Sequence, residues 1–310
     1  MASVIQVKHV TKDFKEVRAV DDLSFTVSQG EVYGFLGQNG AGKSTMIRIL
    51  LTLIEPSHGE VEIFGMNLQR HRKEILRKVG AIIERPDLYK YLTAKENLKI
   101  FGAMSGVKLS EKKIVAQLEM VGLSERGNSK VRTYSQGMKQ RLGIAVALIN
   151  DPELIILDEP MNGLDPQGIA DVRHLILHLS RDLRKTLFVS SHLLNEMEVV
   201  AGSMLIIDRG KKVAEGPVSE LLNPKETNLE VQVLNVEAAE RRLKNSRWSK
   251  YLDQIDGSKI ILKMHSEEIP GFIREAVKME IDITSVRRKH SLEDYFLSLT
   301  AHQHGPAIAN

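Results

Sequence analysis

The chain has 310 residues, of which 42% are hydrophobic and 27% are charged, and its formal net charge is +3. This composition is ordinary for a globular protein, and so small a charge does not by itself indicate nucleic acid as a partner. The absence of cysteine excludes disulfides, thiolate metal sites and cysteine nucleophiles. No apolar run reaches the roughly 18 residues needed to cross a bilayer, and the N-terminus lacks the apolar core of a signal peptide. We therefore expect a cytoplasmic protein that reaches any membrane through a partner.

Apolar strand patterns alternate with amphipathic helix patterns over the first two-thirds of the chain, which predicts an α/β domain. The expected strands cover residues 3–14, 23–27, 31–36, 60–65, 79–84, 154–160, 186–192 and 202–208. The expected helices cover residues 43–54, 92–106, 111–122, 135–150, 166–180 and 193–202. The strand that begins at Leu154 opens with a continuously apolar run, as a strand buried on both faces of a parallel sheet should.

The pattern changes near residues 222–225. Downstream, strands and helices alternate in the order βαββαβ, and a last helix is expected over residues 291–300. The turn signal Asp256-Gly257 separates the two middle strands. We therefore expect a first domain over residues 1–223, a small α+β accessory domain of ferredoxin-like type over 224–300, and a flexible tail over 301–310.

The segment GFLGQNGAGKST follows an apolar strand and opens an apolar-periodic helix. It fits the phosphate-loop pattern Gly-x-x-x-x-Gly-Lys-Ser, in which backbone N–H groups and a helix N-terminus face phosphate oxygens. The lysine supplies a full positive charge to the β- and γ-phosphates, and the serine hydroxyl suits Mg²⁺. The plainer alternative is a glycine-rich turn before an ordinary helix. The expected nucleotide-binding residues here are Gly37, Gln38, Asn39, Gly40, Ala41, Gly42, Lys43, Ser44 and Thr45.

A second motif, LIILDEP, places two adjacent carboxylates after a buried strand. Asp158 can hold Mg²⁺, directly or through water, and Glu159 can polarise the attacking water as a general base. Alone, this motif would indicate no more than a strand end with a solvated acidic turn. Together with the phosphate loop, it predicts a P-loop nucleotide hydrolase.

The segment TYSQGMKQRL lies between these two motifs and resembles the signature of ABC ATPases, which is usually Leu-Ser-Gly-Gly-Gln. Ser135 and Gly137 match the usual residues, whereas Tyr134, Gln136 and Met138 depart from them. A Ser-x-Gly at a helix N-terminus offers a hydroxyl and backbone donors to a phosphate, although Ser135 fits a simple N-cap equally well. The resemblance implies that Ser135, Gln136 and Gly137 face the ATP of a partner subunit.

Further landmarks follow in the order typical of ABC ATPases. The segment GLDP gives Asp165 of the family's D-loop, and VSSH gives His192 at the position of the family's switch histidine, which contacts the γ-phosphate. Phe14 lies where the family stacks an aromatic ring on adenine. The plainer alternatives are a structural histidine and a phenylalanine of the core. The resemblance covers about residues 3–222.

The resemblance implies a fold with a RecA-like P-loop core, an antiparallel β subdomain and a helical subdomain that carries the signature. It also implies an ATPase that uses Mg²⁺ and pairs head to tail with a second copy of itself. Such an ATPase drives a separately encoded membrane permease from the inner face of the cell membrane, and export is favoured over import. The alternative is a soluble ABC ATPase that remodels a nucleic-acid or ribosomal complex. The sequence carries neither the second cassette nor the long coiled-coil insertion usual in that class, and basic clusters such as RRLKNSRWSK fit a solvated face. No nucleic acid is therefore expected as a partner.

The strand expected over residues 79–84 ends on Glu84, where ABC ATPases usually carry a glutamine that touches Mg²⁺ and the attacking water. A carboxylate can still coordinate Mg²⁺, although it cannot donate a hydrogen bond while ionised. A glutamate at the position of Glu84 resembles the ATP-binding subunits of bacitracin- and lantibiotic-resistance exporters. The segment SLEDYFLSLT resembles the C-terminal end of the same subunits. That resemblance implies export of an antimicrobial peptide, drug or lipid-like compound. The alternative is that Glu84 caps the strand and points to solvent. The expected catalytic residues are Glu159, His192 and Glu84, and the expected Mg²⁺ ligands are Ser44, Asp158 and Glu84.

Overall fold

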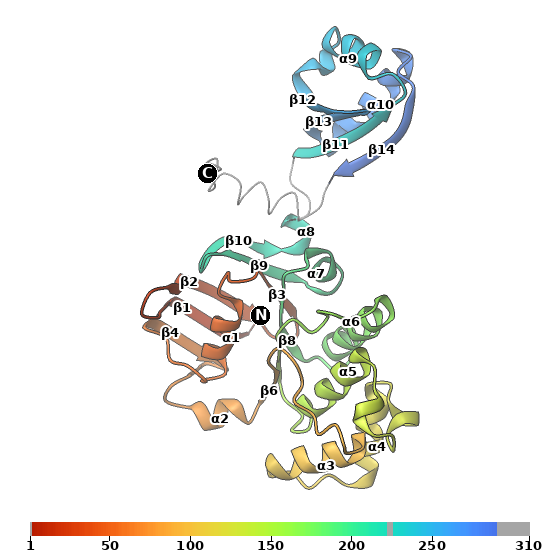
Figure 1. Ribbon diagram of the computed structural model, residues 1–310. Helices are drawn as coiled ribbons and strands as arrows, with labels where there is room; N and C mark the ends of the chain where they lie inside the picture. The colour runs from red at the N-terminus through yellow and green to blue at the C-terminus, as the bar shows by residue number, and fades with distance from the viewer. Residues whose placement is uncertain (1, 222–225, 290–310) are drawn as a thin grey trace. The chain divides into compact units, whose positions relative to one another are not determined.

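The computed structural model describes residues 2–221 and 226–289, so the helix expected at 291–300 and the tail at 301–310 lie outside the described residues. The chain divides into two compact units, Met1–Val218 and Ser219–Asn310. Figure 1 labels the elements of both units. Within the described ranges, every helix is too short or too polar to span a bilayer.

A six-stranded sheet forms the centre of the first unit (Figure 1). Its strands lie in the order β10 (Lys211–Pro217), β9 (Ser203–Asp208), β3 (Val32–Leu36), β8 (Thr186–Ser191), β7 (Leu154–Leu157) and β6 (Val79–Ile82). The five strands from β9 to β6 are parallel, and β10 pairs antiparallel with β9. Every residue of β3 and β7 is buried, which accounts for their unbroken apolar runs. The carboxyl ends of β3, β6, β7 and β8 therefore meet at one edge of the sheet.

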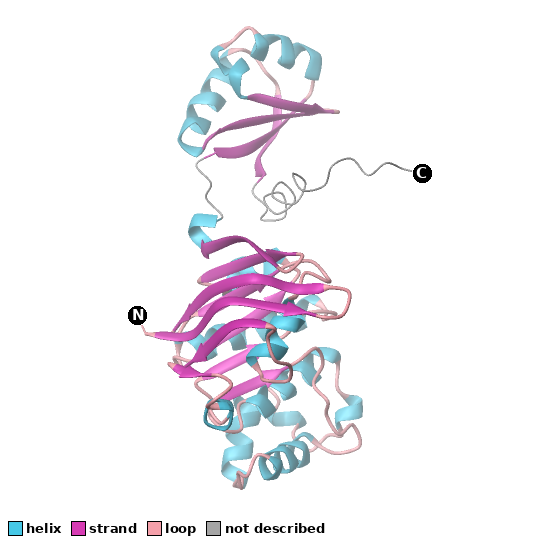
Figure 2. Ribbon diagram, turned by 90° about the vertical axis from the view of Figure 1, so that its left-hand side faces the viewer, coloured by secondary structure: helices cyan, strands magenta, loops and turns pink. Residues whose placement is uncertain are grey.

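A second, antiparallel sheet completes the β structure of this unit, and Figure 2 shows the strands in magenta. Its strands lie in the order β2 (Arg18–Ser28), β1 (Ser3–Asp13), β4 (His58–Ile63) and β5 (Met66–Asn67). Aromatic rings join the two sheets, because the ring centre of Phe25 lies 5.8 Å from that of Tyr33 and 5.9 Å from those of Phe35 and Phe188. Burial, together with the nearby Glu215 carboxylate, raises the pKa of Tyr33 far above its ordinary value.

Helices complete the first unit. They are α1 (Lys43–Leu50), α2 (Arg72–Leu76), α3 (Ala94–Met104), α4 (Glu111–Met120), α5 (Gln136–Ala147), α6 (Pro166–Arg181) and α7 (Leu194–Val200). The short helix α8 (Val218–Leu221) spans the point in the chain where the first unit ends. The helices α3, α4 and α5 lie together at one side of the unit (Figure 1). Asn97 of α3 is fully buried, donates to the carbonyl oxygens of Tyr89 and Thr93, and accepts from the N–H of Tyr89. These bonds fix the segment that connects β6 to α3. Pro86 of the same segment packs on Gly143 of α5, where a Cβ would lie 2.5 Å from Pro86 Cβ.

Several elements differ from the sequence prediction. α1 ends at Leu50 rather than at residue 54, because Thr52 has a left-handed φ of 56° and the N–H of Leu53 bonds back to the carbonyl oxygen of Arg48. β2 begins at Arg18 rather than at residue 23. β10 and α2 were not predicted from the apolar pattern, because both are rich in charged residues. β10 is an edge strand, where charged side chains discourage pairing with another chain.

Over residues 226–289, the second unit is an antiparallel sheet with two α-helices. Its elements are β11 (Glu226–Val233), α9 (Val236–Lys244), β12 (Leu252–Asp256), β13 (Lys259–His265), α10 (Ile269–Lys278) and β14 (Ile283–Lys289). The strand order is β12-β13-β11-β14, and the βαββαβ sequence of elements is that of ferredoxin-like domains. Gly257 turns the chain between β12 and β13 with a φ of 56°. Trp248 and Phe272 meet edge to face in the core, with ring centres 5.4 Å apart.

Candidate functional site

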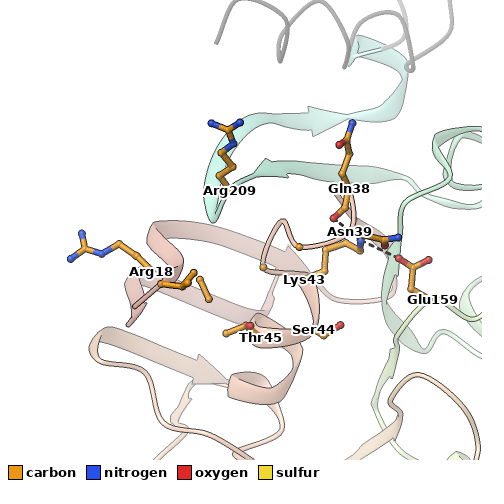
Figure 3. Close-up of a pocket in the computed structure, with 12 residues that line it drawn as sticks. Arg18, Gln38, Asn39, Lys43, Ser44, Thr45, Glu159 and Arg209 are labelled. Atoms are coloured by element: carbon orange, nitrogen blue, oxygen red, sulfur yellow. Dashed lines mark hydrogen bonds and ion pairs between the residues drawn. The ribbon is translucent and has the colours of Figure 1, made fainter. Parts of the chain in front are cut away.

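A pocket of about 470 Å³ opens at the edge of the parallel sheet where β3 and β7 end (Figure 3). The loop between β3 and α1 forms most of its wall. The start of β2 and the turn between β9 and β10 complete it. Its lining residues are Val17, Arg18, Ala19, Gln38, Asn39, Gly40, Gly42, Lys43, Ser44, Thr45, Glu159 and Arg209. A pocket of this size suits a small-molecule ligand.

The loop between β3 and α1 has a backbone that only glycine can form at its last position. Gly42 has a φ of 107°, and a Cβ there would lie 2.3 Å from the carbonyl oxygen of Ala19. The carbonyl oxygen of Ala41 accepts a hydrogen bond from the N–H of Gly210 at 2.9 Å, so the turn after β9 supports the loop. Gly42 is also the N-cap of α1 and has no side chain to cap the first turn. The first N–H groups of α1 and the positive end of its dipole can therefore face an anion.

Lys43 lies at the centre of this loop and is almost fully buried, with 5% of its side chain exposed. Its Nζ donates to the carbonyl oxygen of Gly37 at 2.6 Å and to that of Gln38 at 3.2 Å. The same atom forms an ion pair with Glu159 Oε1 at 3.1 Å, which Figure 3 marks with a dashed line. A buried ammonium group held in this way is a fixed positive charge beside the helix N-terminus.

Glu159 follows β7 in a left-handed conformation, with a φ of 49°. Its second carboxylate oxygen, Oε2, lies 2.7 Å from Nδ1 of His192, and the N–H of His192 also donates to it at 3.4 Å. The carboxylate therefore lies between the cation of Lys43 and the imidazole of His192. A strained backbone of this kind persists only where the surrounding structure holds it in place, and it is common at functional sites. The arrangement places a potential proton acceptor at the edge of the pocket.

Asp158 is buried beside the pocket and uses both carboxylate oxygens. Oδ2 accepts from Ser44 Oγ at 3.1 Å, and Oδ1 accepts from Ser190 Oγ at 2.5 Å. Ser190, the fifth residue of β8, also accepts from the N–H of Glu159 at 3.0 Å. One serine thus orients both acidic residues. No role was predicted for Ser190, although the Ser-Ser pair directly before His192 is the signal that could have indicated one.

The oxygen atoms around Ser44 suit a magnesium ion. Mg²⁺ binds through one or two carboxylates together with substrate phosphates and water. Ser44 Oγ and Asp158 Oδ2 are hard oxygen ligands 3.1 Å apart, next to the loop whose N–H groups face the pocket. These two residues therefore fit the ion, and the other ligands would be phosphate oxygens and water.

Glu84 lies beyond the end of β6, since the strand stops at Ile82 rather than at residue 84. Its backbone is left-handed, with a φ of 56°, and 65% of its side chain is exposed. The carboxylate pairs with Nη2 of Arg48 at 3.1 Å, one helical turn beyond Ser44 on α1. In the structure the Glu84 carboxylate therefore contacts the guanidinium of Arg48 rather than Ser44 or Asp158. Its contact with Mg²⁺ stays a prediction.

Phe14 and the predicted residues of the signature and the D-loop do not line the pocket, and neither do Gly37 and Ala41 of the phosphate loop. Phe14 lies in the turn between β1 and β2, half exposed, with Nζ of Lys12 5.2 Å from its ring centre. Ser135 caps α5 by accepting from the N–H of Met138 at 3.2 Å, while Gln136 is exposed and Gly137 is buried. Asp165 caps α6 by accepting from the N–H of Gly168 at 3.3 Å. Their contacts with ATP stay predictions.

Two arginines that were not predicted as site residues also line the pocket. Arg18 donates to Asp13 and to Asp21, and these bonds raise the pKa of its guanidinium above the ordinary value. Arg209 occupies the turn between β9 and β10 with a left-handed φ of 46°.

Comparison with known proteins gives one consistent result. A family model described as "ABC transporter" matches residues 20–162. The bacitracin transport ATP-binding protein BcrA of Bacillus licheniformis is 41% identical over 304 residues, covering 96% of this chain and 98% of the relative. The lantibiotic transport ATP-binding protein SrtF of Streptococcus pyogenes is 40% identical over 212 residues, covering 68% of this chain and 90% of the relative. Among solved structures, the ATP-binding cassette MJ0796 as a post-hydrolysis dimer with ADP and Pi matches with a TM-score of 0.62 and 27% identity, over 69% of this chain and 98% of that one.

Proposed function

This chain belongs to the ABC transporter family, and we propose that it is the ATP-hydrolysing subunit that powers a separate membrane permease for an antimicrobial peptide. The observation that carries the proposal is the convergence of Lys43, Glu159 and Asp158 at one edge of the parallel sheet. We assign the ATPase domain to residues 1–223, which include the matched segment 20–162, and an accessory domain to residues 224–300.

The mechanism follows from the positions of these side chains. The phosphate loop and Lys43 bind the β- and γ-phosphates of ATP. Glu159, oriented by His192, takes a proton from the water that attacks the γ-phosphate. Ser44 and Asp158 would hold Mg²⁺, which would neutralise charge on the phosphates. Nucleotide must also draw Lys43 away from Glu159, which frees the carboxylate for the attacking water.

We infer that two copies of the chain pair head to tail around ATP. Ser135 and Gln136 are exposed at the N-terminus of α5 and do not line the pocket of their own chain. A hydroxyl at a helix N-terminus suits a phosphate, and the MJ0796 cassette is described as a dimer. Each ATP would then lie between the phosphate loop of one copy and the signature of the other. Closure on ATP and opening after hydrolysis would move a membrane partner between two states.

The substrate class rests on the printed names of the relatives, which transport bacitracin and a lantibiotic. We propose a membrane-active peptide antibiotic as the cargo. The permease that selects it would be a separate chain, and this subunit would bind the permease at the inner face of the cell membrane.

Removing this chain from its own cells tests the proposed function. We expect the cells to become more sensitive to a subset of peptide antibiotics, and wild-type protein to restore resistance. The tagged chain should co-purify with a polytopic membrane protein from detergent-solubilised membranes. Unchanged sensitivity across a peptide panel, with co-purification of ribosomes instead, would contradict the proposal.

Replacing Glu84 by glutamine should leave ATP binding intact but disturb the coupling of hydrolysis to transport. The amide loses the ion pair with Arg48 and gains a hydrogen-bond donor. In the variant, the segment that connects β6 to α3 should therefore take a different position from that in the wild-type chain during the ATPase cycle. Peptide transported per ATP hydrolysed, measured in proteoliposomes with the permease, checks this. Glu62→Gln, which breaks the partly buried ion pair with Lys8 outside the site, is the matched control. A coupling ratio in the Glu84 variant equal to wild type would show that Glu84 has no special role.

A further inference from the structure

The helix α5, which begins at the signature, packs beside α6, which begins at the D-loop (Figure 1). One glycine of each helix, Gly137 and Gly168, lies at this contact. A Cβ on Gly137 would lie 3.2 Å from Cα of Gly168. A Cβ on Gly168 would lie 3.5 Å from Cα of Gly137 and 2.8 Å from Oδ1 of Asp165. That oxygen is the one that caps α6 through the N–H of Gly168. Gly168 therefore touches both the signature, through Gly137, and the D-loop, through Asp165.

A charged contact holds the same two helices together one turn further along. Nη2 of Arg141 on α5 pairs with Asp171 of α6 at 3.4 Å, and only 17% of the arginine side chain is exposed. The other carboxylate oxygen of Asp171 accepts from Gln167 at 2.8 Å. Nη1 of Arg141 donates to the carbonyl oxygens of Val121 at 2.9 Å and Gly122 at 3.1 Å, just beyond α4. One guanidinium thus connects α4, α5 and α6.

We propose that these contacts form a clamp that holds the signature and the D-loop as one rigid piece, and that Gly168 and Arg141 are positioning residues for the ATP reaction. The α5–α6 clamp consists of Gly137, Gly168, Arg141 and Asp171. This inference rests on the proposed head-to-tail dimer, in which the signature acts on the ATP of the partner. The clamp acts in trans, because its residues do not line the pocket of their own chain.

The physical reason is the sensitivity of phosphoryl transfer to position. A displacement of about 1 Å at a positioning element can lower a rate by about 10²-fold. An added Cβ at position 168 would meet Cα of Gly137 at an ordinary 3.5 Å but Oδ1 of Asp165 at only 2.8 Å, so the D-loop cap must shift. An added Cβ at position 137 would lie 3.2 Å from Cα of Gly168, so the two helices would have to give way slightly. Two rigid loops joined at one point would engage the partner's nucleotide together rather than separately.

The first test substitutes Gly168 by alanine in the full chain and compares it with Gly271→Ala. Both glycines are helical, but a Cβ at Gly271 meets only Trp248 at an ordinary 3.7 Å. We expect Gly168→Ala to lower kcat by about tenfold or more, with monomer affinity for a fluorescent ATP analogue and thermal stability unchanged. Placed in a Glu159→Gln background, it should also lower the fraction of ATP-dependent dimer measured by sedimentation. Gly271→Ala should match its parent in every measurement.

A second test keeps the helix backbones as they are. Arg141→Gln and Asp171→Asn should each reduce ATP-dependent dimer and kcat, and the double variant should lose no more than the worse single one, because both remove the same contact. His178→Gln, which removes the exposed pair with Asp182 on the same helix, is the control and should have no effect.

Two results would overturn the clamp. One is a Gly168→Ala protein that dimerises and turns over like Gly271→Ala, together with additive losses in the Arg141 and Asp171 variants. The other is a loss of monomer nucleotide binding and thermal stability in step with turnover, which would mean a role in folding only. If instead the Glu159→Gln parent itself forms no dimer with ATP, the proposed head-to-tail function fails, and the clamp fails with it.

Discussion

Replacing Glu159 by glutamine should slow ATP hydrolysis by about 10²-fold or more, the range expected when a general base is lost. Glutamine keeps the size of the side chain but cannot accept a proton from the attacking water. Nucleotide binding should be retained or strengthened. In the wild-type chain the Glu159 carboxylate pairs with Nζ of Lys43 at 3.1 Å, and so competes with phosphate for that cation. The amide removes this competition.

Phosphate release under saturating ATP measures the rate, and a fluorescent ATP analogue measures the affinity. Glu153→Gln is a matched control, because Glu153 directly precedes β7 and its side chain forms an exposed ion pair with Lys78. It should hydrolyse ATP at the wild-type rate. Hydrolysis by Glu159→Gln at a rate close to that of wild type would sink the assignment of Glu159 as the base, and His192 would then be the next side chain to test.

Replacing Gly42 by alanine should abolish nucleotide binding under ordinary assay conditions. The new Cβ would lie 2.3 Å from the carbonyl oxygen of Ala19, and the φ of 107° is one that alanine rarely adopts. The loop must move, and its N–H groups then no longer point toward the phosphates. Loss of two charge-assisted hydrogen bonds, at about 1.5–3 kcal/mol each, corresponds to a loss of affinity of roughly 10²-fold or more.

The control for Gly42 is Gly30→Ala. Gly30 also has a left-handed backbone, with a φ of 78°, but an added Cβ would meet no described atom within 4 Å. It should therefore lower stability by about 1–2 kcal/mol through backbone strain alone and leave nucleotide affinity unchanged. Equal affinities for Gly42→Ala and wild type, measured by titration with the fluorescent analogue, would show that the loop does not bind the phosphates.

The sequence predicted the parts of the site that are local in the chain. The phosphate loop around Lys43 and the acidic pair after β7 are short motifs whose chemistry follows from their own residue types. The structure brings Lys43 and Glu159 into contact and places His192 beside Glu159. The three residues were assigned to one ATP site from the sequence, but these contacts were not predicted, and they arise because the carboxyl ends of parallel strands meet at one edge.

The sequence did not predict the contacts between distant segments. Ser190 bonds to Asp158 only because β7 and β8 are neighbours, and Arg48 reaches Glu84 only because α1 passes the end of β6. No local pattern contains either pair. The ends of elements were also missed, as at Thr52, where a left-handed residue ends the turn that follows α1 although the apolar pattern continues. Local pattern and tertiary contact are different kinds of information, and only the first can be read directly from the sequence.

The aromatic cluster between the two sheets has a consequence for folding during synthesis on the ribosome. Phe25, Tyr33 and Phe35 leave the ribosome early, whereas Phe188 follows only after the whole helical subdomain. The central strand β3 can pair only after both of its neighbours, β8 and β9, have been synthesised. Contacts so distant in sequence form slowly, and incomplete cores expose apolar surface. A nascent chain that stalls before residue 186 therefore carries a phosphate loop whose supporting strand has no partner on either side, and it should depend on chaperones until synthesis passes residue 208.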